Sequence, residues 1–356
     1  MKFYVYKFFG IFLFFSLSFS VFAENKNQEE FFVGKILQVS QNSPDEFGNI
    51  IQKLKIEILT TKQKIEIENG NFRNFSEEQK FSPGEQIVLV KMENGEFSII
   101  ENYRLSGIFW ILIIFLLTVV AIVGFSGLGS VFGLFLGIFV VIFGIIPGIL
   151  HGTNAIFLSV LSAIFITPIS MILAHKARFP TFVAILSTFL TILLAIFFAI
   201  FAVKICKLFG LGDESAQFLQ MENFSIEKLR GILFVGILLG TLGVLDDITA
   251  AQTFTVFKIY KTNPKQNFCQ VFKSSFSIGR EHINSMINTL AMAYFGASLP
   301  LFIIFSRSQM PFWVILNSEI VAEEIVRIIA GSFALILAVP ISTFLATVFV
   351  FHQKKF

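Results

Sequence analysis

The stretch GTLGVLDDITAAQTF, residues 240–254, places two adjacent carboxylates, Asp246 and Asp247, inside a segment that otherwise has the composition of a membrane-spanning helix. A charged aspartate at the centre of such a helix costs about 2.5–3.5 kcal/mol on the insertion scale. Acidic side chains at this depth usually face the interior of a helix bundle and mark a functional site. The stretch therefore predicts a helical membrane protein whose function involves these two acids.

The composition of the whole chain agrees with this class. Of the 356 residues, 55% are hydrophobic and 14% are charged, and the formal net charge is +3. The basic residues are scattered over short loops, which argues against a nucleic-acid partner. The two cysteines, Cys206 and Cys269, belong to no CxxC pattern and to no His/Cys cluster, so we expect no zinc, haem or other cofactor. The sequence leaves open whether the acidic residues bind a metal.

The N-terminal part of the chain differs from the rest. Residues 1–23 carry basic residues before an apolar run that ends in a small-residue site, which predicts a signal peptide; an uncleaved N-terminal anchor is the alternative. Residues 24–104 alternate apolar and polar side chains, as in QKLKIEIL at 52–59, and contain the turn pairs Asn69-Gly70 and Asn94-Gly95. This pattern predicts an extracytoplasmic domain of about five short strands, a small β-barrel or β-sandwich.

Residues 105–356 form the predicted membrane domain. No Lys, Arg, Asp or Glu occurs from Leu105 to His175, a run far too long for one span of about 20 residues. With the β-domain outside, the basic loop 175–180 and the basic C-terminal tail fall on the cytoplasmic side, as the positive-inside rule requires. Gly- and Pro-containing turns divide the domain into about seven transmembrane helices: 107–124, 129–146, 154–174, 181–203, 231–251 or slightly beyond, 284–305 and 328–351.

Helical periodicity defines one face of the acidic span. Gly236, Gly240, Gly243 and Asp247 recur at spacings of four, three and four residues and so share a side of the helix. Small residues there allow close helix packing, which predicts that Asp247 faces a neighbouring helix. Asp246 lies about 100° around the helix, either in a second crevice or directed toward the interface. The alternative is that both acids lie at the inner end of a tilted helix.

The sixth span contains the predicted partners of the two acids. Its sequence is SIGREHINSMINTLAMAYFGASLPLF, residues 277–302. Four polar residues recur there at helical spacing and form a polar ridge: Glu281, Asn284, Asn288 and Thr289. We expect this ridge to line a cavity together with Asp246 and Asp247. The alternative is polar contact between helices without a cavity. Arg280 is a candidate ion-pair partner of either aspartate. Gly279, Gly296 and Pro300 are assigned to helix packing, and the last two predict a break in the helix.

The segment before this span has a different pattern. After the Asn263-Pro264 turn, Phe268, Phe272 and Phe276 alternate with lysines. This arrangement predicts an amphipathic helix that lies on the membrane surface.

GTLGVLDDITAAQ (240–252), the Asn263-Pro264 loop and SIGREHINSMINTLAMAYFGASLPL (277–301) resemble the corresponding stretch of the YibE/F-like family of bacterial membrane proteins. The layout of an N-terminal hydrophobic segment, an extracytoplasmic domain and a multi-helix region is similar as well. The resemblance implies a multi-pass protein of the bacterial cytoplasmic membrane but no particular reaction. It also implies a set of signature residues: Gly243, Asp246, Asp247, Gly279, Arg280, Asn288, Thr289, Gly296 and Pro300.

Two classes of function stay open. The leading hypothesis is a transporter or permease-like protein that moves an ion or small solute past the acidic and polar residues of the fifth and sixth spans. The alternative is a membrane scaffold or sensor that acts through protein partners of the β-domain. An enzyme is not expected, because two neighbouring aspartates on one helix do not face each other as an aspartic dyad does. The sequence indicates neither the substrate nor the oligomeric state.

Overall fold

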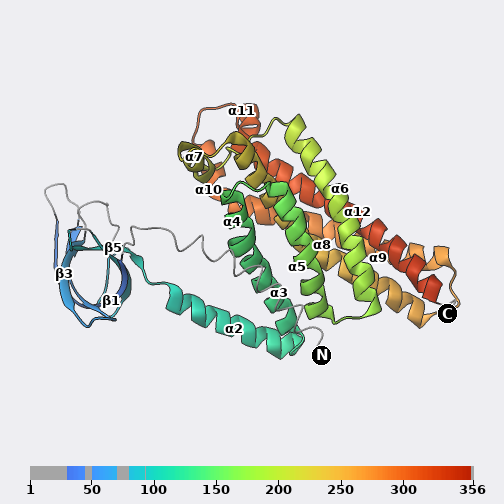
Figure 1. Ribbon diagram of the computed structural model, residues 1–356, viewed down its shortest axis with the longest axis horizontal. Helices are drawn as coiled ribbons and strands as arrows, with labels where there is room; N and C mark the ends of the chain where they lie inside the picture. The colour runs from blue at the N-terminus through green and yellow to red at the C-terminus, as the bar shows by residue number, and fades with distance from the viewer. Residues whose placement is uncertain (1–29, 45–49, 70–79, 93, 354–356) are drawn as a thin grey trace. The chain divides into compact units, whose positions relative to one another are not determined.

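The computed structural model describes residues 30–44, 50–69, 80–92 and 94–353 (Figure 1). The predicted signal peptide or anchor at residues 1–23 lies outside these ranges. The described chain forms two compact units, divided between Ala121 and Ile122. We call them the β-unit, which also contains most of helix α2, and the helical unit.

Five antiparallel strands in the described part of the β-unit form one sheet in the order β3-β2-β1-β4-β5. Two shifts of register in β1, at Ile36/Gln38 and at Val39/Gln41, are bulges that increase its curvature. The sheet curls into a half-barrel, which confirms the predicted small β-domain. The strands are β1 (Glu30–Pro44), β2 (Ile50–Ile58), β3 (Lys64–Asn69), β4 (Gln86–Lys91) and β5 (Phe97–Asn102).

The core of the β-unit follows directly from the alternating sequence of its strands. Leu54, Ile56 and Ile58 of β2 point inward and are at most 1% exposed, while Lys55 and Glu57 between them are partly exposed on the opposite face. Gly34 of β1 lies over this core without a side chain. A Cβ atom at Gly34 would lie 2.6 Å from Ile56 Cγ2 and 2.8 Å from Leu89 Cδ1, so this position has no space for one.

Within the described residues, six helical segments are long and apolar enough to cross a membrane, and a bent pair makes a seventh. The prediction of about seven transmembrane helices is confirmed. They are α2 (Leu105–Val123); α3 (Gly127–Val140), which continues through a π-helical turn η3 (Val141–Ile145) into α4 (Ile146–Leu150); α5 (Ala155–His175); α6 (Phe179–Ile205); α8 (Ile226–Thr262); α9 (Phe268–Ala297) with α10 (Leu299–Ser306); and α12 (Glu319–Gln353). Two short helices, α7 (Glu214–Met221) and α11 (Phe312–Asn317), lie between them.

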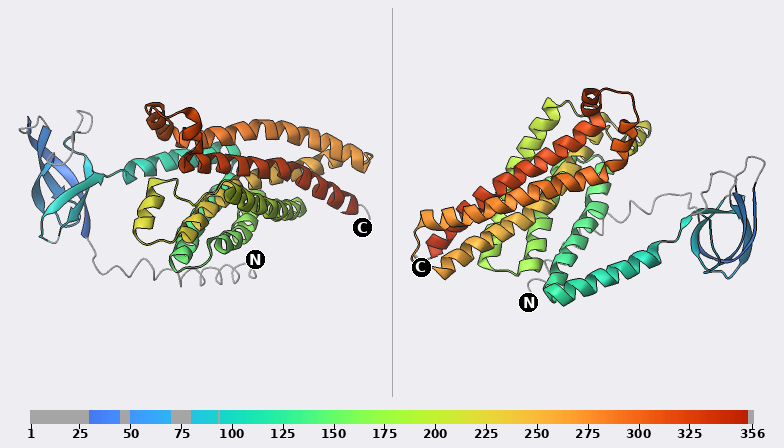
Figure 2. Two further views of the ribbon diagram at one scale, coloured as in Figure 1. Left: turned by 90° about the horizontal axis from the view of Figure 1, so that it is seen from above. Right: turned by 180° about the vertical axis from the view of Figure 1, so that it is seen from behind.

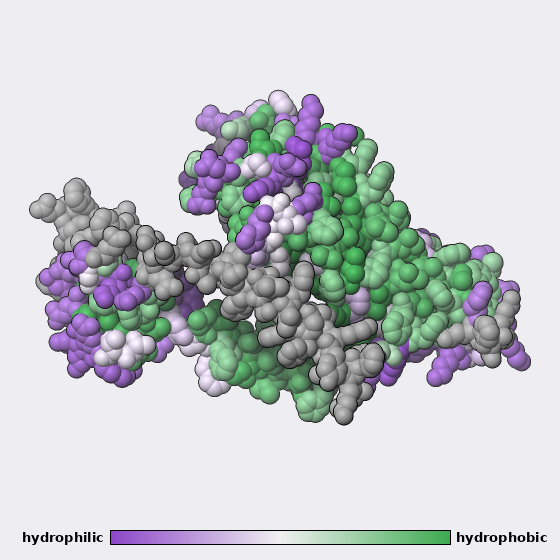
Figure 3. Space-filling model, viewed as in Figure 1, coloured by the Kyte–Doolittle hydropathy of each residue, from purple (hydrophilic) through white to green (hydrophobic). Residues whose placement is uncertain are grey.

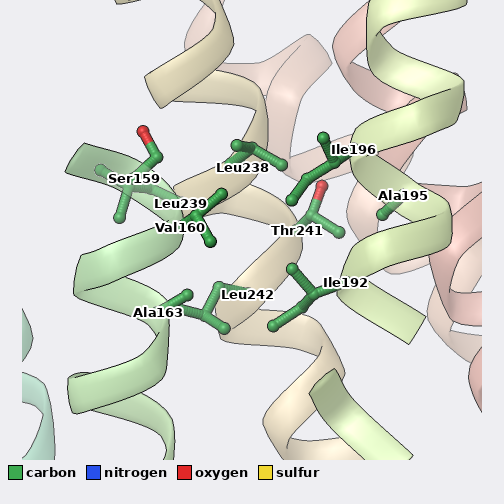
Figure 4. A pocket seen from close by; sticks show the side chains of 10 residues that line it. All are labelled: Ser159, Val160, Ala163, Ile192, Ala195, Ile196, Leu238, Leu239, Thr241 and Leu242. Atoms are coloured by element: carbon green, nitrogen blue, oxygen red, sulfur yellow. The ribbon is translucent and has the colours of Figure 1, made fainter. Parts of the chain in front are cut away.

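Helix α8 is the centre of the helical unit. It contacts α5, α6, α9 and α12, and α9 and α12 lie side by side in both views of Figure 2. Ala163 of α5, Ile192 of α6 and Leu242 of α8 point toward one another in a tight apolar contact (Figure 4). The void left there is about 10 Å³, about the smallest volume that holds one water molecule. These three helices are therefore closely packed at this level.

The outer surface of the helical unit is largely apolar. In the view of Figure 3, hydrophobic residues cover the outward faces of α5 and α6, and hydrophilic residues gather around α7. On α6, Phe197 is 74% exposed and Ile205 is 65% exposed. Large exposed apolar side chains in this density are expected of helices that are surrounded by lipid.

The segment after the Asn263-Pro264 turn corrects one prediction. It forms no separate surface helix but the first part of α9, which begins at Phe268 with a capping box between Asn267 and Gln270. The Phe268 ring packs on Phe344 and Phe351 of α12, at centroid distances of 6.3 and 5.9 Å. Amphipathicity alone does not tell whether an apolar side meets lipid or another helix, and here it meets α12.

The break predicted from Gly296 and Pro300 is confirmed. Helix α9 ends at Ala297, α10 begins at Leu299, and the two helices are bent by 63°. Pro300 lies in the first turn of α10, where its missing N–H has no intrahelical partner to lose.

We predict that Gly34→Ala destabilises the β-unit. The added methyl group collides with Ile56 and Leu89, and overpacking of this kind costs about 1–3 kcal/mol. Thermal unfolding of the detergent-solubilised full chain measures the effect. Gly107→Ala in α2, where nothing lies within 4 Å of the added Cβ, is the control. Equal unfolding temperatures for the two variants would contradict the prediction.

Candidate functional site

Asp246 and Asp247 line a cavity of about 640 Å³ that is bordered by α3, η3, α5 and α8. We call it the acidic cavity. Its other polar lining residues are Ser130, Ser170 and His175, and the rest of its lining is apolar or glycine. A volume of this size accommodates a small organic molecule, and a mainly apolar wall with a few polar groups is typical of ligand sites.

Glycines shape the acidic cavity. A Cβ at Gly133 of α3 would lie 3.1 Å from the Cβ of Ser170, so α3 and α5 approach closely there. Nothing lies within 4 Å of a Cβ built at Gly243 of α8, which opens this side of α8 to the cavity. The structure thus places Gly243 at the cavity and not at the helix contact for which the sequence analysis assigned it.

The carboxylate of Asp246 has an asymmetric environment. Its Oδ2 accepts a hydrogen bond of 3.0 Å from the Ser170 hydroxyl of α5. Its Oδ1 is buried, and the buried Thr167 hydroxyl of α5 lies close enough to the carboxylate to interact with it, although the geometry falls short of a regular hydrogen bond. The Asp246 carboxylate therefore has one regular hydrogen bond, from Ser170, and one weaker hydroxyl neighbour, Thr167.

Asp247 occupies a more open position in the same cavity. Its side chain is exposed, and it interacts electrostatically with His175 at the end of α5. The His175 ring in turn lies 5.2 Å from the ring of Phe254 on α8. The two neighbouring acids thus differ, one being bonded to a hydroxyl and partly enclosed, the other accessible and near an imidazole.

Two local irregularities border the acidic cavity. Val141 and Ile142 of the π-helical turn η3 belong to its lining, and π-turns inside α-helices occur frequently at functional sites. Pro168 lies within α5 beside Thr167, and its missing N–H leaves the carbonyl of Ile164 without its helical donor. Both helices facing α8 across the cavity therefore contain a point of weakened backbone hydrogen bonding.

The structure does not bring the predicted polar ridge of α9 to the two aspartates. This ridge is exposed on α9 and contributes nothing to the lining of the acidic cavity: Glu281, Asn284, Asn288 and Thr289. The buried positions of α9 are Val271, Ser275, Gly279 and Leu290. The joint cavity expected from the sequence is corrected accordingly, because α5 and α3, and not α9, face the acids. A binding role of the ridge itself stays a prediction.

The predicted ion pair of Arg280 is also absent. Arg280 is exposed on α9 and forms no ion pair with any carboxylate in the described ranges. It follows Gly279 directly, and Gly279 is the residue that meets α12 and α8. Arg280 lies about 100° around α9 from Gly279, on an exposed side of the helix.

The remaining predicted packing residues fall into two groups. A Cβ at Gly240 would collide with the Tyr294 hydroxyl of α9, and one at Gly279 would lie 2.7 Å from Gln252 Oε1 of α8. These two glycines lie at close helix contacts. At Gly236 the nearest atom is Arg327 Nη2 at 3.9 Å, and at Gly296 nothing lies within 4 Å, so neither position is tightly packed.

A second polar group, at the start of α12, was missed by the sequence analysis. Glu319 Oε1 accepts hydrogen bonds from the backbone N–H groups of Phe209, Gly210 and Leu211. The buried Glu323 accepts one from the Gly212 N–H at 3.1 Å. Both glutamates precede the predicted last span, 328–351. Nothing in their spacing indicated that they bind the loop after α6.

No three His, Cys, Asp or Glu side chains of the described chain gather as a metal site would require. Cys206 and Cys269 are both free and exposed.

The comparison with protein families agrees with the resemblance found in the sequence. A family model described as YibE/F-like protein matches residues 111–352, a range that contains the whole acidic cavity and both signature stretches. No curated protein and no solved structure matches the chain.

We predict that Ser170→Ala destabilises the helical unit. The change removes the hydrogen bond to Oδ2 of the largely enclosed Asp246 carboxylate, which costs about 1–3 kcal/mol. Thermal unfolding in detergent is the measurement. Ser130→Ala, an exposed serine of the same cavity, serves as the matched control and should unfold like the unmodified protein. A loss no greater than that of the control would contradict the role of Ser170.

Proposed function

The chain belongs to the YibE/F-like family, and from this membership and the acidic cavity we propose that it is a transporter for a cationic solute or for a proton-coupled solute. The observation that carries the proposal is that two adjacent carboxylates, Asp246 and Asp247, line one cavity of about 640 Å³. Intramembrane acids that face an internal cavity commonly carry protons or bind cations.

The two acids have separate roles in this proposal. Asp247, which is exposed and lies near His175, attracts a cation into the cavity. Asp246, held by Ser170, then binds the cation or exchanges its own proton for it. The apolar lining contributed by α3 and α5 suits the apolar part of an amphiphilic solute, so we expect an organic cation in preference to a small hydrated ion.

Movement through the cavity requires a change in helix packing. The contact of α5, α6 and α8 leaves a void of only about 10 Å³, and Leu239 and Leu242 belong both to this contact and to the wall of the acidic cavity (Figure 4). The conformation described is therefore closed on this side. Pro168 in α5 and the π-turn η3 are the points at which we expect α5 and α3 to bend away from α8.

We further propose that the protein lies in the bacterial cytoplasmic membrane with the β-unit outside and the C-terminus in the cytoplasm. The loop between α5 and α6 carries Lys176 and Arg178, and the C-terminal tail carries Lys354 and Lys355. An excess of basic residues on these loops supports the cytoplasmic placement of both.

One observation favours the alternative function of a membrane scaffold or sensor. The exposed polar ridge of α9 lies on a helix that forms the predicted sixth span with α10. Polar side chains in a membrane helix are usually covered by another protein helix. A partner protein, or a second copy of the chain, bound to this ridge would fit a protein that passes signals without transporting a solute.

A labelling experiment separates the two functions. In a variant without Cys206 and Cys269, we expect Gly243→Cys to react with a water-soluble maleimide in membrane vesicles, because a side chain at this position enters the acidic cavity. Ala250→Cys, on the same helix but 2% exposed, is the control that should not react. If Gly243→Cys stays unlabelled from both sides, the cavity is dry and the transporter proposal fails.

Transport itself is tested in proteoliposomes. We expect Asp246→Asn and Asp247→Asn to abolish movement of a lipophilic organic cation driven by a pH gradient, because each change removes a negative charge from the acidic cavity. Glu281→Gln, outside the cavity, should retain transport. Retention of transport by both aspartate variants, with normal membrane insertion, would rule out the proposed path.

A further inference from the structure

A second cavity, of opposite charge, lies where α6 ends and α8 begins. It has a volume of about 370 Å³ and is lined by Lys204, Lys207 and Arg230. The other lining residues are apolar, among them the buried Val203 and Phe234, and none is acidic. We call it the basic cavity. Three cations around one cavity with apolar walls form a site for an anion that also has an apolar part.

Arg230 is held in place from two directions. Its Nε donates a hydrogen bond of 3.2 Å to the Leu208 carbonyl, and its guanidinium carbon lies 5.3 Å from the centroid of the Phe209 ring. The terminal nitrogens of Arg230 bond to no residue in the ranges that the structure describes. A guanidinium fixed in this way offers two free donors to a ligand without further ordering.

The three cations of the basic cavity are not held in ion pairs within the described residues. Lys204, Lys207 and Arg230 form no ion pair with a carboxylate of the described chain. Glu319 lies next to this loop, but its Oε1 is already occupied by the backbone N–H groups of residues 209–211. Glu319 keeps its negative charge, but it contacts the backbone of the loop and forms no ion pair with the three cations in the described part of the chain.

Lys207 has a backbone conformation that normally favours glycine. Its φ angle is 53°, and it follows the last residues of α6 in a Schellman arrangement, with the Leu208 N–H bonded to the Val203 carbonyl at 3.0 Å. A residue with a side chain is disfavoured here, and such residues persist where their side chain has a function. Lys62 and Lys176 also have a positive φ angle, so the backbone alone assigns no role to Lys207; its ammonium group is of interest because the residue lines the basic cavity.

The position of the basic cavity indicates the kind of anion. On α6, the residues just before it are exposed and apolar: Phe197, Ile200, Phe201 and Ile205. The cavity therefore lies where a lipid-facing helix surface ends and a polar loop begins. A phospholipid at this level brings its phosphate to the cations and its glycerol and upper acyl carbons to the apolar wall. A free phosphate would leave the apolar wall unused.

We propose that the basic cavity binds the phosphate of an anionic phospholipid. Lys204, Lys207 and Arg230 contact the phosphate, and Val203 and Phe234 contact the apolar part of the lipid. This site is separate from the acidic cavity, and the proposal does not depend on transport.

Lipid retention by the purified full chain tests the proposal. In neutral detergent micelles, the unmodified protein should retain phosphatidylglycerol over phosphatidylcholine by at least about tenfold, measured by native mass spectrometry. K204Q/K207Q/R230Q should lose this preference. K258Q/K261Q/K265Q removes the same charge from exposed lysines in the region where α8 ends and should keep it. Equal retention of the two lipids by the unmodified protein, or an equal loss in both triple variants, overturns the proposal.

Two further measurements complete the test. Inorganic phosphate at millimolar concentration should not displace phosphatidylglycerol; if it does, and binds equally well without lipid, the site is one for free phosphate and the lipid assignment is wrong. Lys207→Gly suits the backbone at this position, so it should unfold at the same or a higher temperature and still lose several-fold in phosphatidylglycerol preference. An unchanged preference in this variant removes Lys207 from the site.

Discussion

Asp246 belongs to α8, a helix that is enclosed by other helices. Only α5 and α3 lie on the side of α8 to which its carboxylate points. On its remaining sides α8 packs against α6, α9 and α12, where most contacts are apolar. The hydroxyl groups of Thr188 on α6 and Thr249 on α8 are joined by a buried hydrogen bond of 2.6 Å. Gln252 binds the Ser275 carbonyl of α9 and the Thr343 hydroxyl of α12, which ties these three helices together. Asp246 thus belongs to a helix that is firmly packed against α6, α9 and α12, and its side chain faces the more loosely packed α3 and α5.

Much of the architecture could be predicted from the sequence because hydrophobic length and turn residues are local properties. Spans could be assigned without knowing which helices pack together. The features used were the charge-free run to His175, the basic loop after it and the break between Gly296 and Pro300. The continuation of the acidic helix beyond Asp247 was also predictable, since the apolar run before Asp246 is too short to span a membrane alone. Helix α8 is nevertheless longer than the predicted span of 231–251 or slightly beyond, because it extends from Ile226 to Thr262. The membership in the YibE/F-like family that the signature stretches predicted is confirmed by the family match over residues 111–352.

The neighbours of each helix could not be predicted in the same way. Periodicity showed that Gly240 and Asp247 share a side of α8, but this side meets Tyr294 of α9 at one level and opens toward α3 and α5 at the other. Polar residues on α9 appeared to be partners of the acids only because polar groups in membranes usually pair. The actual partner of Asp246 is Ser170, and a single serine in an apolar helix carries no distinguishing signal.

The length of α8 has an electrical consequence. The helix has 37 residues, so it extends about 55 Å, well beyond the roughly 30 Å of a hydrocarbon core. Glu227 and Lys228 lie near one end and Lys258 and Lys261 near the other, which leaves Asp246 close to the middle of the apolar part. A charge that reaches Asp246 from either side therefore crosses about half of the membrane voltage, which is worth about 1 kcal/mol per 100 mV. In the proposed transport, occupancy of this carboxylate would consequently depend on membrane potential as well as on concentration.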